Sequence, residues 1–285
     1  MALKFATHTI PLLLAAAALT ACGKSETPVT AEAPSVSTAG DTQPAPSSGN
    51  QPLTYRILEF SGTRSTQRGT PGEEIGANLS YPQTGQAVLD NLIETWIAAR
   101  CPVSPDSVRA ATPEGCMNQV LDECVANANA ATGDAPVRCT FGARIEPVLN
   151  DKGLFSLKYT GNHYSGGAHG MPDAGYFNYD VEGERVLALD DVVVVTPALN
   201  DLLNLRMRRE RGVSADQTLK SVGFFEDRLP LTQNVLIESQ GLRFTWQSYE
   251  VAPYALGQPS LLLSYAELGD LISATSPLRR LLAGS

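Results

Sequence analysis

The sequence predicts an α+β fold in which a largely antiparallel sheet is packed by a few amphipathic helices. Two observations support this: strand-like and helix-like segments follow one another in unequal runs from Leu53 onward, and short hairpin-like links occur at Glu182-Gly183 and Ser239-Gln240-Gly241. A length of 285 residues, 43% of them hydrophobic, is enough for one large or two modest globular units. This composition excludes a collagen-like, coiled-coil or wholly disordered chain.

The amino end has the layout of a secretory signal sequence. Lys4 precedes an apolar run over residues 10–19, which is too short to span a bilayer, and small residues follow it. Leu19-Thr20-Ala21-Cys22 resembles the bacterial lipobox, in which the signal is cut before a cysteine that carries lipid. We therefore expect a signal peptide over residues 1–21 and a lipidated Cys22. Two or more acyl chains anchor stably, and Gly23 favours the outer membrane of a Gram-negative bacterium, facing the periplasm.

Residues 22–52 are expected to be the lipidated cysteine followed by a disordered tether. Residues 23–52 hold five Pro, five Ser and no aromatic residue, so they cannot bury enough surface to offset the entropy of ordering. A flexible chain of this length reaches roughly 30 Å. The tether would hold the folded region near a membrane while leaving it free to meet partners.

The charge of the chain favours a cationic partner and argues against nucleic acid. The formal net charge is −9; loss of residues 1–21 would remove Lys4, leaving 20 basic against 30 acidic residues, a net charge of −10. Nucleic-acid binding requires a basic surface, which this balance does not supply. An acidic domain instead attracts basic proteins.

The folded region is expected to begin with two strands and two helices. Residues 53–60 and 75–81 are strand-like, and Pro82 closes the second segment. Residues 86–100 and 114–128 repeat apolar side chains at intervals of three and four, which lines one face of a helix. The apolar positions of these helices are Leu89, Leu92, Ile93, Trp96 and Ile97, and Met117, Val120, Leu121, Cys124 and Val125.

Most of the remaining segments are expected to be strands. Thr196-Pro197 predicts the start of a further helix, because it pairs a cap residue with Pro at the first helical position. Ser214 with Gln217, and Ser264 with Glu267, fit the capping-box pattern of a helix start. The strands are expected over residues 137–149, 154–161, 176–181, 186–189, 234–238, 242–248 and 260–264.

Four cysteines remain after Cys22, and we expect them to form two disulfides in an oxidising compartment. If Cys116 and Cys124 share one helix, eight residues place them roughly 12 Å apart, beyond disulfide reach. Pairing Cys101 with Cys116 and Cys124 with Cys139 is the first choice, because each bond closes a short loop. Pairing 101 with 124 and 116 with 139 stays open. Metal thiolates or a redox pair are disfavoured, because the spacing lacks C-x-x-C.

The glycine-rich segment over residues 159–175, YTGNHYSGGAHGMPDAG, is expected to be a turn-forming loop at the end of a strand. We expect Gly166 and Gly167 to use positive φ there, which a β-branched residue tolerates badly. His163, His169 and Asp173 could supply metal ligands, but their spacing matches no helix-borne zinc motif. Ser165 is not set in G-x-S-x-G, and no acid partner can be assigned to it as a nucleophile. An anion-binding nest lacks a following helix or a lysine. We favour a structural role, in which His169 donates to a backbone carbonyl and locks the turn, with recognition by neighbouring exposed side chains.

Three segments carry specific motifs in a defined order: ANLSYPQTGQAVLDNLIETWI (77–97), SLKYTGNHYSGGAHGMPDAGYFNYDVEGERVLALDDV (156–192) and LRFTWQSYEVAPYALGQPSLLLSYAELGDLI (242–272). Within them, GGAHG followed by YEVAPYALG is the most specific feature. Together the segments resemble the RsiV-like family of extracytoplasmic domains, of the DUF4163/DUF3298 type. The resemblance implies an N-terminal subdomain over residues 53–150 and a C-terminal subdomain over 151–285 that carries the GGAHG loop. The cysteine-containing helical insertion of the first subdomain is particular to this chain or its relatives.

The resemblance also implies a link to the cell wall or to enzymes that cut it. The best understood family member is an anti-sigma factor whose outer domain binds lysozyme, and related domains precede peptidoglycan-deacetylase modules. We expect a non-catalytic, cofactor-free lipoprotein that captures a cationic wall-degrading enzyme such as lysozyme, as an inhibitor, immunity or sensing factor. The alternatives are a peptidoglycan-binding accessory module and a metal-dependent hydrolase that uses His163, His169 and Asp173. The candidate partner-binding residues are Tyr164, Ser165, Gly166, Gly167, His169, Tyr249 and Tyr254.

Overall fold

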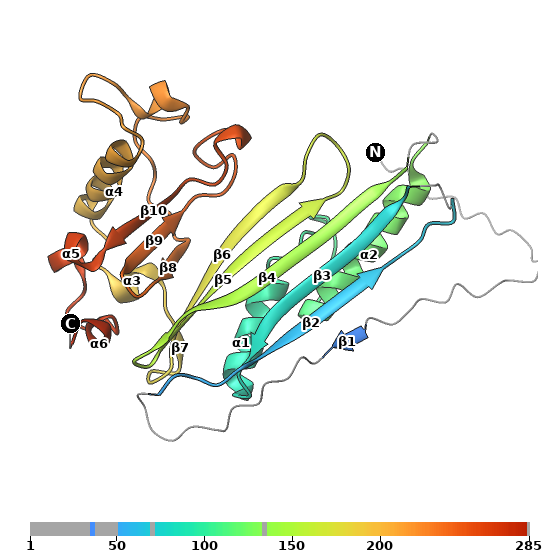
Figure 1. Ribbon diagram of the computed structural model, residues 1–285, viewed down its shortest axis with the longest axis horizontal. Helices are drawn as coiled ribbons and strands as arrows, with labels where there is room; N and C mark the ends of the chain where they lie inside the picture. The colour runs from blue at the N-terminus through green and yellow to red at the C-terminus, as the bar shows by residue number, and fades with distance from the viewer. Residues whose placement is uncertain (1–34, 38–50, 69–71, 133–135, 284–285) are drawn as a thin grey trace, which may run out of the picture. The chain divides into compact units, whose positions relative to one another are not determined.

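The computed structural model describes residues 35–37, 51–68, 72–132 and 136–283, which form two sheets (Figure 1). The larger sheet has seven strands, adjacent in chain order, and β3 and β4 are its one parallel pair. The predicted α+β class with a largely antiparallel sheet is confirmed. The strands are β1 (Ser35–Ser37), β2 (Arg56–Thr63), β3 (Glu74–Gln83), β4 (Arg138–Asp151), β5 (Leu154–Tyr164), β6 (Met171–Asp180) and β7 (Arg185–Val186).

Two helices, α1 (Ala87–Ala98) and α2 (Pro113–Ala130), lie between β3 and β4 in the chain and cover one face of this sheet (Figure 1). The crossover that they form is what allows β3 and β4 to run parallel. α2 begins one residue before the predicted start at Glu114, because the Thr112 side chain accepts a hydrogen bond from the Gly115 N–H and Pro113 occupies the first turn. Alternate residues of β3 face the helices and are buried: Ile75, Ala77, Leu79 and Tyr81.

Both predicted disulfides form with the first-choice pairing. Cys101 joins Cys116, and Cys124 joins Cys139, each across 15 residues of sequence. Cys116 and Cys124 lie on the same helix, α2, as the pairing argument assumed. One bond therefore ties the start of α2 to the segment after α1, and the other ties α2 to β4.

A second hydrophobic core surrounds a three-stranded antiparallel sheet in the order β10-β9-β8. Trp246 is fully buried in this core, and its indole N–H donates to the Pro230 carbonyl at 3.0 Å. The strands are β8 (Val235–Ile237), β9 (Gly241–Thr245) and β10 (Ser260–Ser264), and the helices are α3 (Leu189–Val192), α4 (Pro197–Glu210), α5 (Tyr265–Leu268) and α6 (Arg279–Leu282). Three short 3-10 turns accompany them, η1 (Leu219–Val222), η2 (Tyr254–Leu256) and η3 (Gly269–Leu271).

The two cores belong to the same structural unit, and a buried amide joins their sheets. Asn178 of β6 donates through Nδ2 to the Val235 carbonyl at 2.7 Å, and its Oδ1 accepts from the Ile237 N–H at 2.9 Å. The side chain thus takes the place of a neighbouring strand along β8. The subdomain boundary expected between residues 150 and 151 falls inside β4. It does not separate the two sheets, because the larger sheet continues beyond it through β5, β6 and β7.

Several elements differ from the sequence-based expectations. β6 begins at Met171, five residues before the strand expected over 176–181, because its backbone continues to pair with β5 as far as His163. The glycine-rich segment is therefore two strand ends joined by a short loop. Ser214 and Gln217 make the expected side-chain contact at 2.9 Å, but only a turn follows, so the predicted helix start there is wrong. The box at Ser264 does begin a helix, α5.

The amino-terminal expectations fall mostly outside the described residues. These include the signal peptide, Cys22 and most of the tether over 22–52. Ser35–Ser37 is an exception to the expected disorder, since it forms β1 and pairs with β2. The physical reason is that the edge of β2 otherwise exposes unpaired backbone groups. In the part of the chain that is described, none of the helices combines the length and apolar character needed to cross a membrane.

Candidate partner-binding site

The loop over residues 165–170 joins β5 to β6 and carries the predicted glycine pair. Gly166 and Gly167 have φ angles of +99° and +96°, which residues with a Cβ avoid. The predicted use of positive φ at the glycine pair is confirmed. The Tyr164 hydroxyl donates to the Gly167 carbonyl at 3.0 Å and ties the turn to the end of β5.

Three of the candidate residues, His169, Tyr249 and Tyr254, form a group here called the aromatic cluster. The rings of His169 and Tyr254 stack with centroids 3.7 Å apart and planes 17° from parallel, and Tyr249 lies 6.0 Å from Tyr254. Nδ1 of His169 lies 3.0 Å from the Gly170 carbonyl. A carbonyl only accepts, so Nδ1 is the donor, as predicted, and Nε2 lies 3.4 Å from the Tyr249 hydroxyl.

Tyr249 combines an unusual backbone with high exposure. Its φ is 66°, a conformation that is rare for a bulky residue and costs about 1–3 kcal/mol. Its side chain is 49% exposed, so burial of the ring does not compensate for this cost. The surrounding structure must therefore impose the conformation and hold the ring at the surface.

Two glutamine amides supply part of that constraint. Gln247 Nε2 donates to the Ala174 carbonyl at 2.5 Å, and its Oε1 accepts from the Ala174 N–H at 3.3 Å, which resembles the pairing of two strands. Gln258 donates to the same Gln247 oxygen at 2.6 Å. These contacts fix the segments before Tyr249 and after Tyr254 against β6, and so bring both rings to His169, which is 80 residues from Tyr249 in sequence.

Arg100, two residues after α1, contacts the same part of β6. Its guanidinium donates to both Asp173 oxygens, at 3.0 and 2.6 Å, and to the Ala174 carbonyl at 2.9 Å. It also lies over the ring of Tyr159, 5.0 Å from the centroid, which favours a cation–π interaction. Burial and the Asp173 carboxylate raise the pKa of the Tyr159 hydroxyl, and Arg100 partly opposes them. A Cβ at Gly175 would overlap this guanidinium, so that glycine makes room for Arg100.

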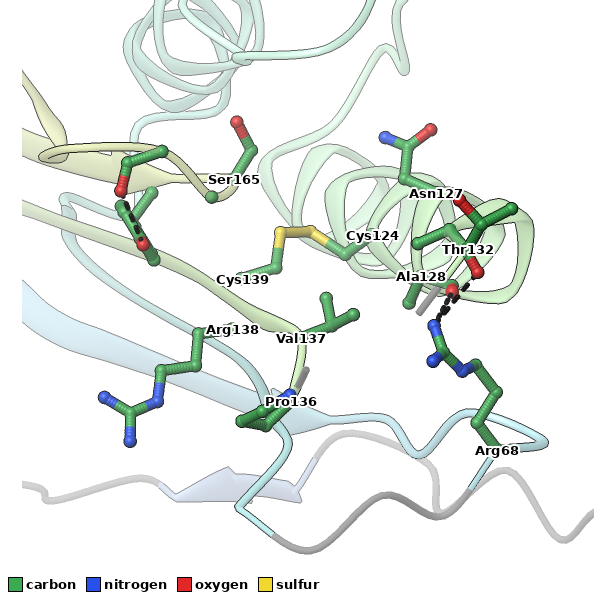
Figure 2. A pocket seen from close by; sticks show the side chains of 14 residues that line it. Arg68, Cys124, Asn127, Ala128, Thr132, Pro136, Val137, Arg138, Cys139 and Ser165 are labelled. Carbon is green, nitrogen blue, oxygen red and sulfur yellow. Dashed lines mark hydrogen bonds between the residues drawn. A yellow bond between two sulfur atoms is a disulfide. The ribbon is translucent and has the colours of Figure 1, made fainter. Parts of the chain in front are cut away.

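The other four candidate residues, Tyr164, Ser165, Gly166 and Gly167, line a pocket of about 360 Å³. The Cys124–Cys139 disulfide forms part of the same wall, between α2 and β4 (Figure 2). Arg68 lies on the far side and donates to the carbonyls of Ala128 and Ala131 at the end of α2. The seven candidates therefore occupy two neighbouring places on one loop system, the pocket and the aromatic cluster.

The structure does not bring His163, His169 and Asp173 together as a metal site. Asp173 is held by Arg100, and His169 is stacked on Tyr254. Among the described residues, the group of three potential ligands within 4.8 Å of one another contains His163 with Cys124 and Cys139 instead. Burial lowers the pKa of His163, and the Glu123 carboxylate opposes this shift. Ser165 is exposed and, in the described part of the chain, has no hydrogen bond to a His, Asp or Glu side chain that would activate it.

Sequence reasoning missed Arg100, Gln247 and Gln258, which position the candidate residues. A polar side chain at the end of a helix or strand has no periodic pattern that reveals its partner. Gly175 was the available signal for Arg100, because a small residue in a strand marks close approach by another group.

The fold is α+β with an exposed aromatic loop system, and the comparisons connect part of the chain to one family. Residues 190–266 match the model of a family described as "Protein of unknown function (DUF3298)". This segment runs from α3 into α5 and includes Tyr249 and Tyr254. No curated protein matches the sequence.

Two solved structures share this fold. A member of the DUF3298 family from Bacteroides fragilis NCTC 9343 is 20% identical, with a TM-score of 0.66, over 82% of this chain and 99% of that chain. A DUF3298 family protein from Pseudomonas aeruginosa PAO1 is 19% identical, with a TM-score of 0.61, over 79% of this chain and 96% of that chain. At these identities the likeness establishes the fold.

Proposed function

We propose that this chain is a cell-envelope lipoprotein that binds a macromolecular partner without catalysing a reaction. The partner is a cationic peptidoglycan hydrolase of the lysozyme type, which the protein inhibits, resists or senses. The anchor is a lipid on Cys22 in the outer membrane of a Gram-negative bacterium, with the folded region in the periplasm. The observation that carries the binding proposal is the aromatic cluster, which is held in place at the surface.

The aromatic cluster has the chemistry of a binding hot spot. Tyrosine is enriched at such positions because its ring buries a large apolar area while its hydroxyl still finds a polar partner. The rings are held in place before a partner arrives by the stacking of His169 on Tyr254 and by the Gln247 and Gln258 contacts that help to impose the φ of Tyr249. Less side-chain entropy is then lost on binding, which favours affinity.

The charge of the chain supports a basic partner. A net charge of −9, or −10 after loss of residues 1–21, accelerates encounter with a cationic protein. Because this contribution is electrostatic, added salt should lower the association rate more than it raises the dissociation rate. The lipobox-like sequence at Cys22 would place the domain where wall-degrading enzymes act.

Binding to immobilised hen lysozyme and sedimentation with purified sacculi test the proposal. We expect lysozyme to retain the wild type, and Tyr254→Ala to weaken retention by about 30-fold, the effect of losing a hot-spot side chain. Tyr55→Ala is the matched control, because Tyr55 is also a partly exposed tyrosine, at 41%, but lies outside the loop system. It should bind as the wild type does.

The two baits separate the candidate partners. Retention by sacculi and not by lysozyme would replace the proposal with a peptidoglycan-binding accessory module. Equal loss in Tyr254→Ala and Tyr55→Ala would contradict the assignment of the surface. Retention by neither bait would refute the proposed partner class.

A further inference from the structure

A second group of reactive side chains lies beside the pocket, separate from the aromatic cluster. Cys124 of α2, Cys139 of β4 and His163 of β5 place their Sγ atoms and an imidazole nitrogen within 4.8 Å of one another. The two sulfur atoms form a disulfide here, and the imidazole lies next to it. These are the ligand types that zinc prefers.

Sheet register explains why these three residues meet. His163 pairs with Phe141 on β4, and Cys139 lies two residues from Phe141, so both side chains point to the same face of the sheet. That face is the one that α2 covers, and α2 supplies Cys124. The ligands therefore come from three elements that the sheet and its covering helix hold in place.

The pocket gives access to the two cysteines of this group. Both Cys124 and Cys139 line it, although each residue as a whole is only 5% or 3% exposed. The other disulfide provides a comparison, since Cys101 and Cys116 do not line this pocket. In the described ranges, no histidine or carboxylate lies close enough to Cys101 and Cys116 to complete a group of three potential metal ligands.

We propose that Cys124–Cys139 is a reducible disulfide whose two thiols, together with His163, form a binding site for Zn²⁺. A dithiol reaching the pocket would transfer two electrons and two protons, breaking the Cys124–Cys139 bond as it forms its own disulfide. Zn²⁺ would then displace the two thiol protons and accept the lone pair of the neutral imidazole. This inference does not depend on the proposed partner.

The distances suit such a site. Zinc binds sulfur at about 2.3 Å and nitrogen at about 2.0–2.1 Å, which sets neighbouring ligand atoms of a tetrahedron roughly 3.3–3.8 Å apart. Ligand atoms that now lie within 4.8 Å reach that spacing by rotation of the cysteine side chains after the sulfur–sulfur bond is broken. Three protein ligands leave the fourth position for a water molecule or another ligand.

Cobalt substitution tests the site, with Co²⁺ as the spectroscopic probe for Zn²⁺. The purified full chain is reduced with dithiothreitol, desalted without oxygen and titrated with Co²⁺. We expect one equivalent to give sulfur-to-cobalt charge-transfer absorption and a tetrahedral spectrum, and Zn²⁺ to displace it. The oxidised chain should give no such spectrum.

Variants assign the ligands. Cys101→Ser/Cys116→Ser, the matched control, should bind the metal as the reduced wild type does, and Cys124→Ser/Cys139→Ser should not bind it. His163→Gln should weaken binding by more than the roughly tenfold loss that follows removal of an outer-shell partner. Binding that survives in Cys124→Ser/Cys139→Ser or is equal in His163→Gln would overturn the assignment. Loss of the native circular dichroism on reduction, before metal is added, would also overturn the proposal. The reduced chain would then be unfolded and would not hold Cys124, Cys139 and His163 together.

Discussion

Replacing Gly167 with valine tests whether backbone conformation, and not crowding, requires glycine in the loop. The φ angle of Gly167 is +96°, and a Cβ built there meets no heavy atom within 4 Å. A Cβ added there would therefore clash with no residue beyond the two chain neighbours. Any loss of stability would come from forcing an L-residue into the left-handed half of backbone space.

The expected magnitude follows from that single cause. The left-handed region costs an L-residue about 1–2 kcal/mol, and a φ well beyond its centre near +57° costs a β-branched residue more, about 2–3 kcal/mol. For a domain of this size each kcal/mol corresponds to about 2–4 °C, so Gly167→Val should lower the Tm by roughly 4–12 °C. Gly167→Ala should fall near the lower end, because alanine has no β-branch.

Urea and thermal unfolding followed by circular dichroism measure this effect. The matched control is Ala168→Val, which adds the same side chain to the next residue of the loop, where φ is not positive and the position is exposed. We expect that control to stay within about 0.5 kcal/mol of the wild type. If Gly167→Val also unfolds within 0.5 kcal/mol of the wild type, the argument from positive φ is refuted.

Two further predictions concern groups that support the site. Arg100→Gln should lower the free energy of unfolding by about 1–2 kcal/mol. This figure is already reduced for solvation, because Asp173 is 36% exposed. Strict additivity in a double-mutant cycle with Asp173→Asn would argue against the ion pair. Burial lowers the pKa of His163 below its ordinary value of 6.5. The stability that the neutral ring contributes is therefore complete above about pH 6.5, and it is lost as the pH falls through the lowered pKa. Between about pH 7 and about pH 5, the free energy of unfolding should therefore fall less in His163→Gln than in the wild type. Equal pH slopes for the two proteins would contradict this.

Regular elements were the most predictable part of the fold. Residues 86–100 and 114–128 were expected as helices, and α1 and α2 end within two residues of those limits. An apolar repeat at helical spacing over three or more turns is a strong local signal. β6 was less predictable, because the glycines around Met171 conceal a backbone ladder that depends on pairing with β5.

The local geometry of the candidate residues was predictable from the sequence, but their arrangement was not. His169 was expected to bond a backbone carbonyl and to be near recognition residues, and Gly166 and Gly167 to adopt positive φ; these expectations depend on chemistry within a few residues. The stacking of His169 on Tyr254 depends on contacts between β6 and Gln247, which no local pattern encodes.

The sequence by itself determined the α+β class, the two amphipathic helices, the hairpin links and the need for glycine at the loop, because each follows from side-chain periodicity or backbone sterics over a short stretch of chain. Of the two cystine pairings that spacing left open, the tertiary structure selected one. It also decided which distant residues meet: Arg100 with Asp173, Tyr249 with His169, and His163 with the Cys124–Cys139 bond. The physical reason is that such contacts depend on strand register and on the packing of helices against a sheet. Both are set by the burial of the whole core and not by any single segment.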